Sequence, residues 1–473
     1  MASQKSVQIT NIPLPTSGLF VEARSGIVNG VYAAALENLM STGVALRTVP
    51  GINWIGLHAP ILRRIPFDAA GYSKYVEIRP DQAVCGNHKI SRTFSASVSA
   101  AKISDNLLIF DGISRPVQYN GLAFSISEFE TNAGVSAERL DGVVVHHDRV
   151  FAWDSRSTAD VYYGDVGAIT GELKRFPMSR LGNIKGSIVA MLSLTLDGAN
   201  NVNDALAVFT STGQIIIYEG LDPGDATGWS LSARVEAACP VSPRAFAQIG
   251  SDVWMLTPHG VVSVRQSIST SVMALVSDIS IPIANLVRDW IEEGGYSWTM
   301  AVNDDGSCIV ISGSNSTTLQ ARQLIYWTKS RSWSTASWPV RDLHNLGGRL
   351  EGTGLDGRLA RFSRENPDQP VTARWESSWF SAGGPSRTVR FVKPTIRASA
   401  PLDVTIRVLS DFNDTPADIA EATQVVRIRP EEPGATVTLS DLIAQDVTGS
   451  VFQITMEVTA QWAEIVSLQA GIG

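Results

Sequence analysis

The stretch DALAVFTSTGQIIIYEG, residues 204–220, decides the fold of this chain. Two short apolar runs at 205–209 and 214–218 flank the segment Thr210-Ser-Thr-Gly213. The β-branched and aromatic residues of these runs favour a pleated, half-buried strand. Glycine adopts a positive φ at no steric cost, so Gly213 suits the last position of a tight turn. The stretch therefore predicts a β-hairpin whose two strands pack in a core.

The hairpin pattern recurs along the chain. Five further segments have the same form, at 107–119, 150–163, 252–266, 298–311 and 349–362. With the first hairpin included, the turns begin at residues 111, 154, 210, 257, 303 and 354, so successive turns are 43, 56, 47, 46 and 51 residues apart. The four tightest turns end on a glycine, and we expect these glycines to be structural turn residues: Gly213, Gly260, Gly306 and Gly357.

A period near fifty residues, with one clear hairpin in each period, is typical of a repeat architecture. Weaker strands at 187–194, 243–249 and 323–327 lie between the hairpins, so each period has room for four strands. Four-stranded sheets of this length close into a ring in β-propellers. A β-solenoid needs a much shorter period, and an immunoglobulin-like string needs roughly 100 residues per module. The sequence therefore predicts a β-propeller of about six four-stranded blades over residues 51–366.

The regions on either side of the repeat differ from it. Residues 1–50 are interpreted as an N-terminal arm and a short helix leading into the propeller, because VYAAALENLM at 31–40 has a helical pattern. A second short helix is expected at 282–291. After the proline-bracketed linker 365–370, residues 371–473 contain seven alternating runs, at 371–380, 387–397, 402–410, 424–429, 435–439, 451–458 and 463–468. These runs predict a C-terminal antiparallel β-sandwich-like domain, so the fold class is all-β.

Composition and charge limit the classes of function. The 473 residues carry a formal net charge of −8, which argues against tight non-specific binding to nucleic acid, although simple solubility explains the acidity equally well. No apolar run approaches the length of a membrane span, and the N-terminus lacks the apolar core of a secretory signal. Cys85, Cys239 and Cys308 are far apart and odd in number, so we expect buried thiols in a protein made in a reducing cytoplasm.

The residue types that carry catalysis or bind metals form no recognisable motif. His146-His147-Asp148 is the one cluster of metal-ligand types, and adjacent strand residues point to opposite faces, so the two imidazoles are not expected to share an ion. The chain lacks the G-x-S-x-G, H-E-x-x-H and Walker motifs, and Trp153-Asp154 is an isolated WD dipeptide. We therefore expect no enzyme activity, no catalytic residue, no cofactor and no metal site.

Two groups of basic residues stand out in the repeat region. Arg358, Arg361 and Arg364 form the denser group, and Lys329 with Arg331 forms the second. A solvated blade face is the default interpretation of such a group. A phosphate contact is the alternative, and nothing else in the sequence supports it.

Several segments, taken in order, resemble one family of viral proteins. The segments are Glu37-Asn-Leu-Met-Ser-Thr-Gly43 through Arg47 to Pro50-Gly51, Arg149-Val-Phe-Ala-Trp153 with Val161-Tyr-Tyr-Gly-Asp165, Ala207–Tyr218, Val253-Trp-Met-Leu-Thr257 with Gly260-Val-Val-Ser-Val264, and Ser386-Arg-Thr-Val-Arg390 followed by Val404–Asp411. Their order resembles that in the tail nozzle proteins of short-tailed bacteriophages, also described as packaged-DNA stabilisation or tail tubular proteins. The resemblance spans most of the chain and rests on pattern and order rather than on one diagnostic motif.

This resemblance implies a structural protein of the virion tail, synthesised in the cytoplasm of the host bacterium. By analogy it implies a six-bladed propeller in a homo-oligomeric ring of six copies below the portal and adaptor. Such a ring is a channel for DNA ejection, helps to retain packaged DNA, and attaches tail fibre, spike or needle proteins. Double-stranded DNA would pass through the lumen without sequence-specific binding. Because Lys and Arg strengthen phosphate binding, we expect some of the acidic excess to face that lumen.

Two other functions remain open from the sequence. The first is a carbohydrate-binding or glycan-hydrolysing propeller of a receptor-binding tail protein. It would need a funnel of aromatic residues with convergent carboxylates on one face of the propeller. The second is a cytoplasmic scaffold propeller.

Overall fold

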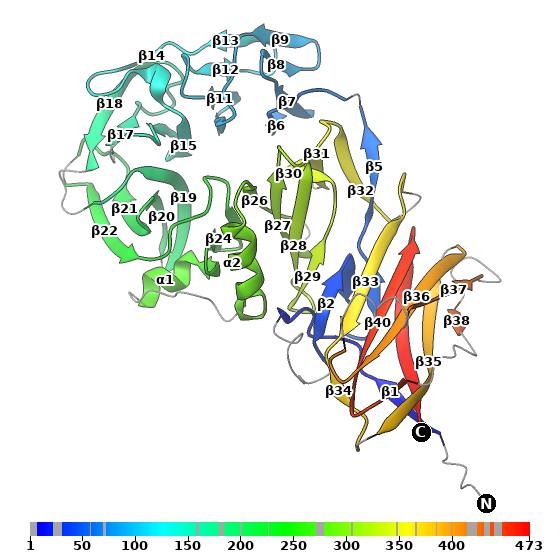
Figure 1. The fold of residues 1–473 in the computed structure, drawn as a ribbon. Helices are drawn as coiled ribbons and strands as arrows, with labels where there is room; N and C mark the ends of the chain where they lie inside the picture. The colour runs from blue at the N-terminus through cyan, green and yellow to red at the C-terminus, as the bar shows by residue number, and fades with distance from the viewer. Residues whose placement is uncertain are drawn as a thin grey trace, which may run out of the picture.

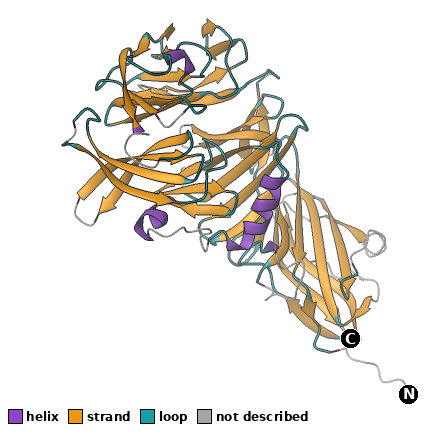
Figure 2. Ribbon diagram, turned by 60° about the vertical axis from the view of Figure 1, so that its left-hand side comes forward, coloured by secondary structure: helices purple, strands orange, loops and turns teal. Residues whose placement is uncertain are grey.

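The computed structural model describes residues 7–21, 31–56, 58–69, 72–157, 160–178, 184–198, 201–225, 227–270, 279–303, 306–346, 349–364, 367–384, 386–398, 400–413, 423–429, 436–438 and 447–473. Small sheets form a ring, and a second domain of two longer sheets extends from one side of it (Figure 1). Among the described residues, helices are few compared with strands (Figure 2). The C-terminus and β1 (Gln8–Ile12) lie at the end of the second domain that is far from the ring.

Each blade of the ring is a small antiparallel sheet, which we name by its innermost strand. Adjacent alternating runs that are joined by short turns pair as hairpins, and this builds the blades in chain order. The β6 blade contains β6 (Arg63–Ala69), β7 (Tyr72–Ile78), β8 (Gln82–Cys85) and β9 (His88–Ser91). The β10 blade contains β10 (Ser99–Ile103), β11 (Asn106–Phe110), β12 (Val117–Tyr119) and β13 (Phe124–Ile126). The β15 blade contains β15 (Gly142–His146), β16 (Arg149–Trp153), β17 (Asp160–Tyr163), β18 (Gly171–Pro177) and a parallel fifth strand, β14 (Phe129–Thr131).

The remaining blades follow the same plan. The β19 blade contains β19 (Ile188–Gly198), β20 (Asn201–Thr210), β21 (Gln214–Gly220) and β22 (Trp229–Glu236). The β23 blade contains β23 (Phe246–Ile249), β24 (Asp252–Thr257) and β25 (Gly260–Ser263), followed by α1 (Val264–Thr270). The β30 blade contains β30 (Val340–Leu346), β31 (Arg349–Gly354), β32 (Leu359–Ser363) and an outer strand from the N-terminal region, β5 (Gly51–Ile55).

One further position in the ring lies between β23 and β30 and belongs to a larger sheet. It is filled by β26 (Ser297–Val302), β27 (Cys308–Asn315), β28 (Gln320–Trp327) and β29 (Ser332–Ala336), which continue outward into a ten-stranded sheet. Within the described residues, six sheets of three to five strands therefore stand alone as blades beside this larger sheet. The predicted propeller of about six blades is confirmed, although the β15 blade has five strands and the β23 blade three instead of the predicted four.

The opening stretch forms the two middle strands of its blade. β20 and β21 pair with each other and lie between β19 and β22. At the turn, Gly213 has a φ of 83°, and a Cβ there would lie 2.0 Å from the Ala237 carbonyl oxygen. Gly357 has a φ of 88° and would clash in the same way with the Ala59 carbonyl oxygen, at 1.9 Å. Gly260 and Gly306 also have positive φ values, of 125° and 65°.

One of the six predicted turns is out of phase with the others. Five of them join the second and third strands of a blade, as Asp111 and Asp154 do after β11 and β16. The turn that begins at Asn303 instead joins the first and second strands, β26 and β27, and its residues 304 and 305 lie outside the described residues. The spacing of 46 residues before it is therefore coincidental, because the connection from β25 to β26, residues 264–296, is long and contains helical segments.

The second domain is a sandwich of two sheets. One sheet contains β3 (Leu39–Ser41), β4 (Leu46–Thr48), β41 (Ala463–Ile472), β35 (Arg387–Ala398) and β38 (Thr436–Thr438), with β1 and β39 (Val447–Gly449) at its sides. The other continues the ten-stranded sheet through β2 (Ala33–Glu37), β33 (Val371–Ser377), β40 (Val451–Ala460), β36 (Leu402–Ser410) and β37 (Thr423–Ile428), with β34 (Phe380–Ser381) beside β40. Residues from both sheets share one apolar core, which confirms the predicted sandwich-like domain: Leu46, Val392, Ile465, Trp375, Val404 and Met456.

The helix expected at 31–40 is wrong. This segment forms β2 and β3, and β2 lies between β29 of the ring and β33 of the sandwich. Asn38 separates the two strands with a φ of 54°, and its amide nitrogen donates to the Thr372 carbonyl at 2.7 Å and to Ser337 Oγ at 3.0 Å. Partners 299 and 334 residues away in sequence override the local helical pattern. The N-terminal region therefore completes the sandwich with β1–β4 rather than forming a separate arm.

The second predicted helix is confirmed. A 3-10 turn at Ile281–Ile283 leads into α2 (Ala284–Glu292), and Ile283 and Val287 are buried in the core that the β23 and β26 blades share with the sandwich. Part of the predicted linker is ordered against the ring, because the Asp368 carboxylate accepts from the Trp54 amide at 2.7 Å. Residues 365 and 366 of that linker lie outside the described residues.

Candidate functional site

The structure explains the histidine cluster differently from the sequence. His146 ends β15, whereas His147 and Asp148 form a turn with φ values of 48° and 55°. The two imidazoles therefore lie edge to face at 4.2 Å instead of on opposite faces. The ring of His146 is buried, its Nδ1 contacts Ser193 Oγ at 2.8 Å, and burial with the nearby His147 lowers its pKa to about 4. Across the described ranges, no three His, Cys, Asp or Glu side chains gather closely enough to hold a metal ion.

The denser basic group noted in the sequence is largely paired within the protein. Arg358 donates to Asp356 at 2.8 Å and stacks over Trp54 at 4.5 Å. Arg361 donates to Glu351 at 2.6 Å, and Arg364 contacts the Met40 sulfur at 3.2 Å. This cluster is therefore not a free basic face.

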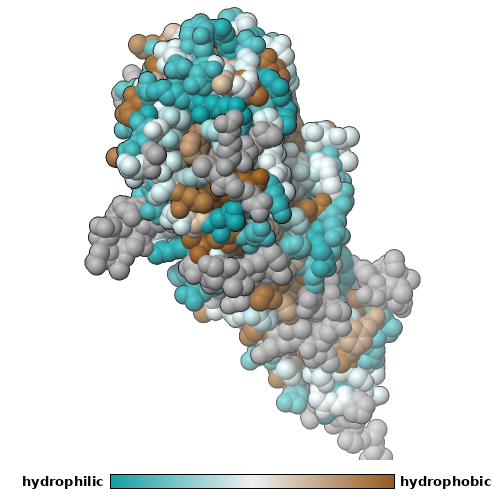
Figure 3. All heavy atoms as spheres, turned by 90° about the vertical axis from the view of Figure 1, so that its left-hand side faces the viewer, coloured by the Kyte–Doolittle hydropathy of each residue, from teal (hydrophilic) through white to brown (hydrophobic). Residues whose placement is uncertain are grey.

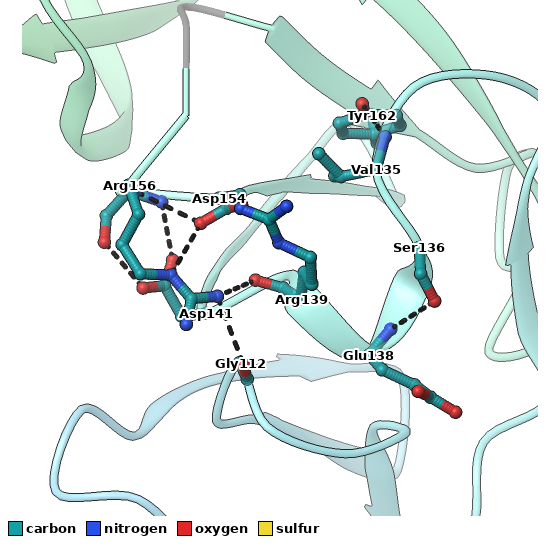
Figure 4. Close-up of polar contacts among 10 residues, drawn as sticks. Gly112, Val135, Ser136, Glu138, Arg139, Asp141, Asp154, Arg156 and Tyr162 are labelled. Carbon is teal, nitrogen blue, oxygen red and sulfur yellow. Dashed lines mark hydrogen bonds and ion pairs between the residues drawn. The ribbon is translucent and has the colours of Figure 1, made fainter.

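A polar network joins the β10 and β15 blades (Figure 4). Asp154 is buried, its Oδ1 accepts from the amide and Nε of Arg156 at 3.1 and 2.9 Å, and its Oδ2 pairs with Arg139 at 2.8 Å. Nη2 of Arg156 donates to the carbonyls of Gly112 and Arg139 at 3.1 and 2.7 Å. Asp141 accepts from the amide and hydroxyl of the residue after Asp154 at 2.8 and 2.6 Å. The network ties turns of two blades together, which gives the lone WD dipeptide a structural role.

Apolar side chains fill most of the interfaces between blades. Separate clusters occupy the β6–β10, β10–β15, β15–β19, β19–β23 and β26–β30 interfaces, and the large core shared with the sandwich fills the β23–β26 interface. The remaining interface lies between β30 and β6, where the ring closes. Among the described residues, no apolar cluster spans this interface. We call it the polar seam.

Arg64 and Glu77 form one half of the polar seam. Arg64 is buried and donates from Nε and Nη2 to Glu77 at 3.0 and 2.9 Å. Across the interface, Nη2 of Arg64 donates to the Gly357 carbonyl at 2.8 Å, and Nη1 lies 3.5 Å from Thr353 Oγ1. Burial alone would raise the pKa of Glu77, but the hydrogen bond from Arg79 and the charge of Arg64 outweigh it and lower that pKa.

Tyr75 and Glu351 form the other half. The Tyr75 hydroxyl donates to Glu351 Oε2 at 2.5 Å, and Arg361 donates to Oε1 of the same buried carboxylate. Burial and this hydrogen bond raise the pKa of Tyr75. The ring of His344 lies edge to face with Tyr75 at 4.7 Å and is buried, and neither of its nitrogens has a hydrogen-bond partner among the described residues. Burial lowers the pKa of His344 to about 4.

Three further arginines lie next to the seam. Arg63 begins β6, Arg341 is the second residue of β30, and Arg244 lies two residues before β23. Arg244 donates to both carboxylate oxygens of Asp342 at 2.8 Å. No sequence motif predicts this group, which we call the axial arginine cluster. The one local signal is the pair of adjacent arginines at the start of a strand.

One surface cavity lies between the β26 and β30 blades. It has a volume of about 390 Å³ and is lined by Leu319, Gln320, Ala321, Arg322, Ser337, Trp338, Pro339 and Leu355. Its lining contains a single aromatic residue and no carboxylate. It therefore lacks the aromatic funnel with convergent acids that a glycan site needs.

No protein-family model matches the chain, and no curated protein is similar to it at a significant level. Among solved structures, YCF48 from Cyanidioschyzon merolae is 14% identical, with a TM-score of 0.40 over 67% of this chain and 99% of that chain. The β-propeller domain of Cps50 (Swd1) from Myceliophteria thermophila is 13% identical, with a TM-score of 0.42 over 66% of this chain and 99% of that chain. The WD40 β-propeller domain of Doa1 is 10% identical, with a TM-score of 0.37 over 72% of this chain and 96% of that chain. Similarities this low add nothing about function. The assignment of the propeller fold rests on the sheet topology described above.

No described helix has the length and apolarity that crossing a bilayer requires. Cys85 and Cys308 are buried, as the sequence predicted, whereas Cys239 is half-buried.

Proposed function

We propose that this chain is a subunit of the distal tail nozzle of a short-tailed bacteriophage. The observation that carries the proposal is the order of the sequence segments that resemble that family, from 37–51 at the start to 386–411 in the C-terminal domain. The architecture is consistent with it, because most of both segments belongs to one sandwich attached to a propeller, in which β41 lies between β4 and β35. In this proposal the chain is a structural virion protein without enzymatic activity.

A DNA conduit needs a stiff wall, and the packing of this chain supplies one. The β2 strand is hydrogen-bonded to β33 of the sandwich and touches β29 of the ring, so the two domains share a continuous sheet. Closed rings of blades also leave few long free strand edges. We infer that several copies, six by the family resemblance, form a ring that joins the adaptor and portal on one side. Fibre, spike or needle proteins would attach on the other.

Exposed apolar side chains support assembly into a larger particle. Among the described residues, the largest exposed fractions belong to side chains in different turns and strands: Val44 at 81%, Leu122 at 78%, Leu221 at 65%, Val425 at 65%, and Val166 and Leu319 at 63%. Hydrophobic and hydrophilic residues are mixed on the outer face of the ring (Figure 3). Contacts with neighbouring copies would cover such side chains.

Electron microscopy tests this function. Purified protein is examined by negative staining, and phage particles from the same host are labelled with a gold-conjugated antibody against the chain. We expect closed rings with an axial channel and gold at the distal end of the tail. Antibody absorbed with the purified chain is the control. A monomer that never assembles, together with unlabelled particles, would contradict the proposal, and binding to host surface glycans would favour the receptor-binding alternative.

A further inference from the structure

The axial arginine cluster lies at one end of the ring. Arg63, Arg244 and Arg341 stand at or just before the first residues of three inner strands. Because blades repeat around a common axis, the beginnings of their inner strands lie at the same end of that axis. Inner strands β6, β15, β19, β26 and β30 surround the centre of the ring in Figure 1. The three side chains are half-buried, so they remain partly accessible to solvent.

The cluster carries more positive charge than its own acid neutralises. Asp342 is buried and accepts both of its short contacts from Arg244. Arg63 donates to the Val98 carbonyl, which has no formal charge. The Nε of Arg341 is buried and has no hydrogen-bond partner among the described residues. Arg63, Arg244 and Arg341 with Asp342 leave an excess of two positive charges within the cluster. The neighbouring Arg64 is paired with Glu77, which it shares with Arg79.

Without a bound anion, the proximity of these positive charges destabilises the protonated arginines. Burial and the charge of Arg244 lower the pKa of Arg63 to about 10, although Asp342 opposes them. Burial also lowers the pKa of Arg341, with further lowering from Arg64 and Arg244 and an opposing effect of Asp342. Like charges at short range in a partly desolvated site repel one another strongly. An anion at this place would remove that repulsion.

We propose that the axial arginine cluster binds a phosphate dianion. Two negative charges match the excess of two, whereas a carboxylate would leave one positive charge uncompensated. Guanidinium groups form paired hydrogen bonds to phosphate oxygens. The charges of Arg63 and Arg341 each interact with that of Arg244, which belongs to a third blade. His344, two residues after Asp342 on β30, has an unpartnered N–H that extends the same set of donors. The proposal does not depend on the nozzle function, because it rests on the ring alone.

Isothermal titration of the full chain with inorganic phosphate tests the site. The buffer is phosphate-free at pH 7.5, and a titration with sodium chloride of equal ionic strength corrects for general salt effects. We expect saturable binding of one phosphate per chain. Arg341→Gln removes one guanidinium and should weaken the affinity at least tenfold. Arg427→Gln, an exposed arginine on β37 of the sandwich, should leave the affinity unchanged.

Circular dichroism shows whether each variant is folded. If Arg341→Gln does not fold, Arg244→Gln replaces it, because that side chain is about a third exposed at the rim of the cluster. The absence of saturable phosphate binding to the wild-type chain would overturn the proposal. Equal affinities of the wild type and the folded cluster variant would also overturn it, since phosphate would then bind elsewhere.

Discussion

The β15–β19 interface and the polar seam join neighbouring blades by different means. In the first, the rings of Phe151 and Tyr218 lie 5.9 and 5.5 Å from that of Trp229, within a fully apolar cluster. In the seam, Arg64 and Glu351 are buried and satisfied by partners that include groups across the interface. Apolar burial stabilises by roughly 25 cal/mol per Å², whereas a buried ion pair roughly breaks even after desolvation. The apolar interfaces therefore contribute most of the stability of the ring. The polar groups of the seam determine which two blades pair to close it.

The largest expected effect is in the apolar interface. Phe151→Ala leaves a cavity among aromatic rings and should lower the free energy of unfolding by about 3–5 kcal/mol. Urea denaturation measures this value. Val166→Ala, at an exposed position, is the control and should change it by less than about 0.5 kcal/mol. A cost of Phe151→Ala as small as that of the control would mean that this interface contributes little.

The two buried histidines make stability depend on pH in both kinds of interface. His146 lies by the apolar interface and His344 in the seam, and both have a pKa of about 4, below the ordinary 6.5. The unfolded chain therefore binds protons that the folded chain does not, so stability is present above pH 6.5 and is lost as the pH falls from there towards 4. Each histidine accounts for up to about 3 kcal/mol.

Urea unfolding between pH 4.5 and 7.5 measures this dependence. His146→Gln and His344→Gln should each flatten the slope. The charged groups around His344 are Asp342, Arg64, Glu351 and Arg63, of which the two acids oppose the shift and the two arginines add to it. An unchanged slope in both variants would show that these histidines are not neutral in the folded protein.

A smaller effect is expected for the hydrogen bond across the seam. Glu351→Gln removes the charge that pairs with Arg361, whose side chain is already half-exposed, and weakens the acceptor of the Tyr75 hydroxyl. The free energy of unfolding should therefore fall by about 1–3 kcal/mol. Tyr75→Phe alone and the double variant complete a double-mutant cycle. The double variant should cost less than the sum of the two single changes, because both partners are then removed together. Strict additivity would mean that the two side chains do not interact.

The sequence predicted those parts of the molecule in which strands pair with strands that are close to them in the chain. Hairpins such as 204–220 and the alternating runs after 371 pair with their neighbours in the chain, so periodicity and turn residues are sufficient to find them. The alanine-rich run that forms β2 was assigned to a helix because its strand partners, β29 and β33, lie far away in sequence. The turn at Asn303 was placed between the wrong pair of strands in its blade, because a tight turn has the same local sequence pattern wherever it lies in a blade.

The axial arginine cluster was beyond prediction for the same reason. Arg63, Arg244 and Arg341 come together only because their blades meet at the ring axis, and no spacing within the sequence marks them. The polar seam was equally hidden. Its alternation of residues along β31, with Glu351 and Thr353 on one face, is normal for a strand, and only the closed ring shows that this face meets Arg64 and Tyr75.

Thiol labelling tests the central comparison most directly. Thr353→Cys places a thiol in the seam at a fully buried position, and the native Cys85 and Cys308 report on the apolar β6–β10 and β26–β30 interfaces. The three sites are labelled with a maleimide under native conditions and followed by peptide mass spectrometry. We expect the seam to open more readily than the apolar interfaces. The thiol at position 353 should therefore react about tenfold faster than both native thiols. Equal protection at all three sites would contradict the account.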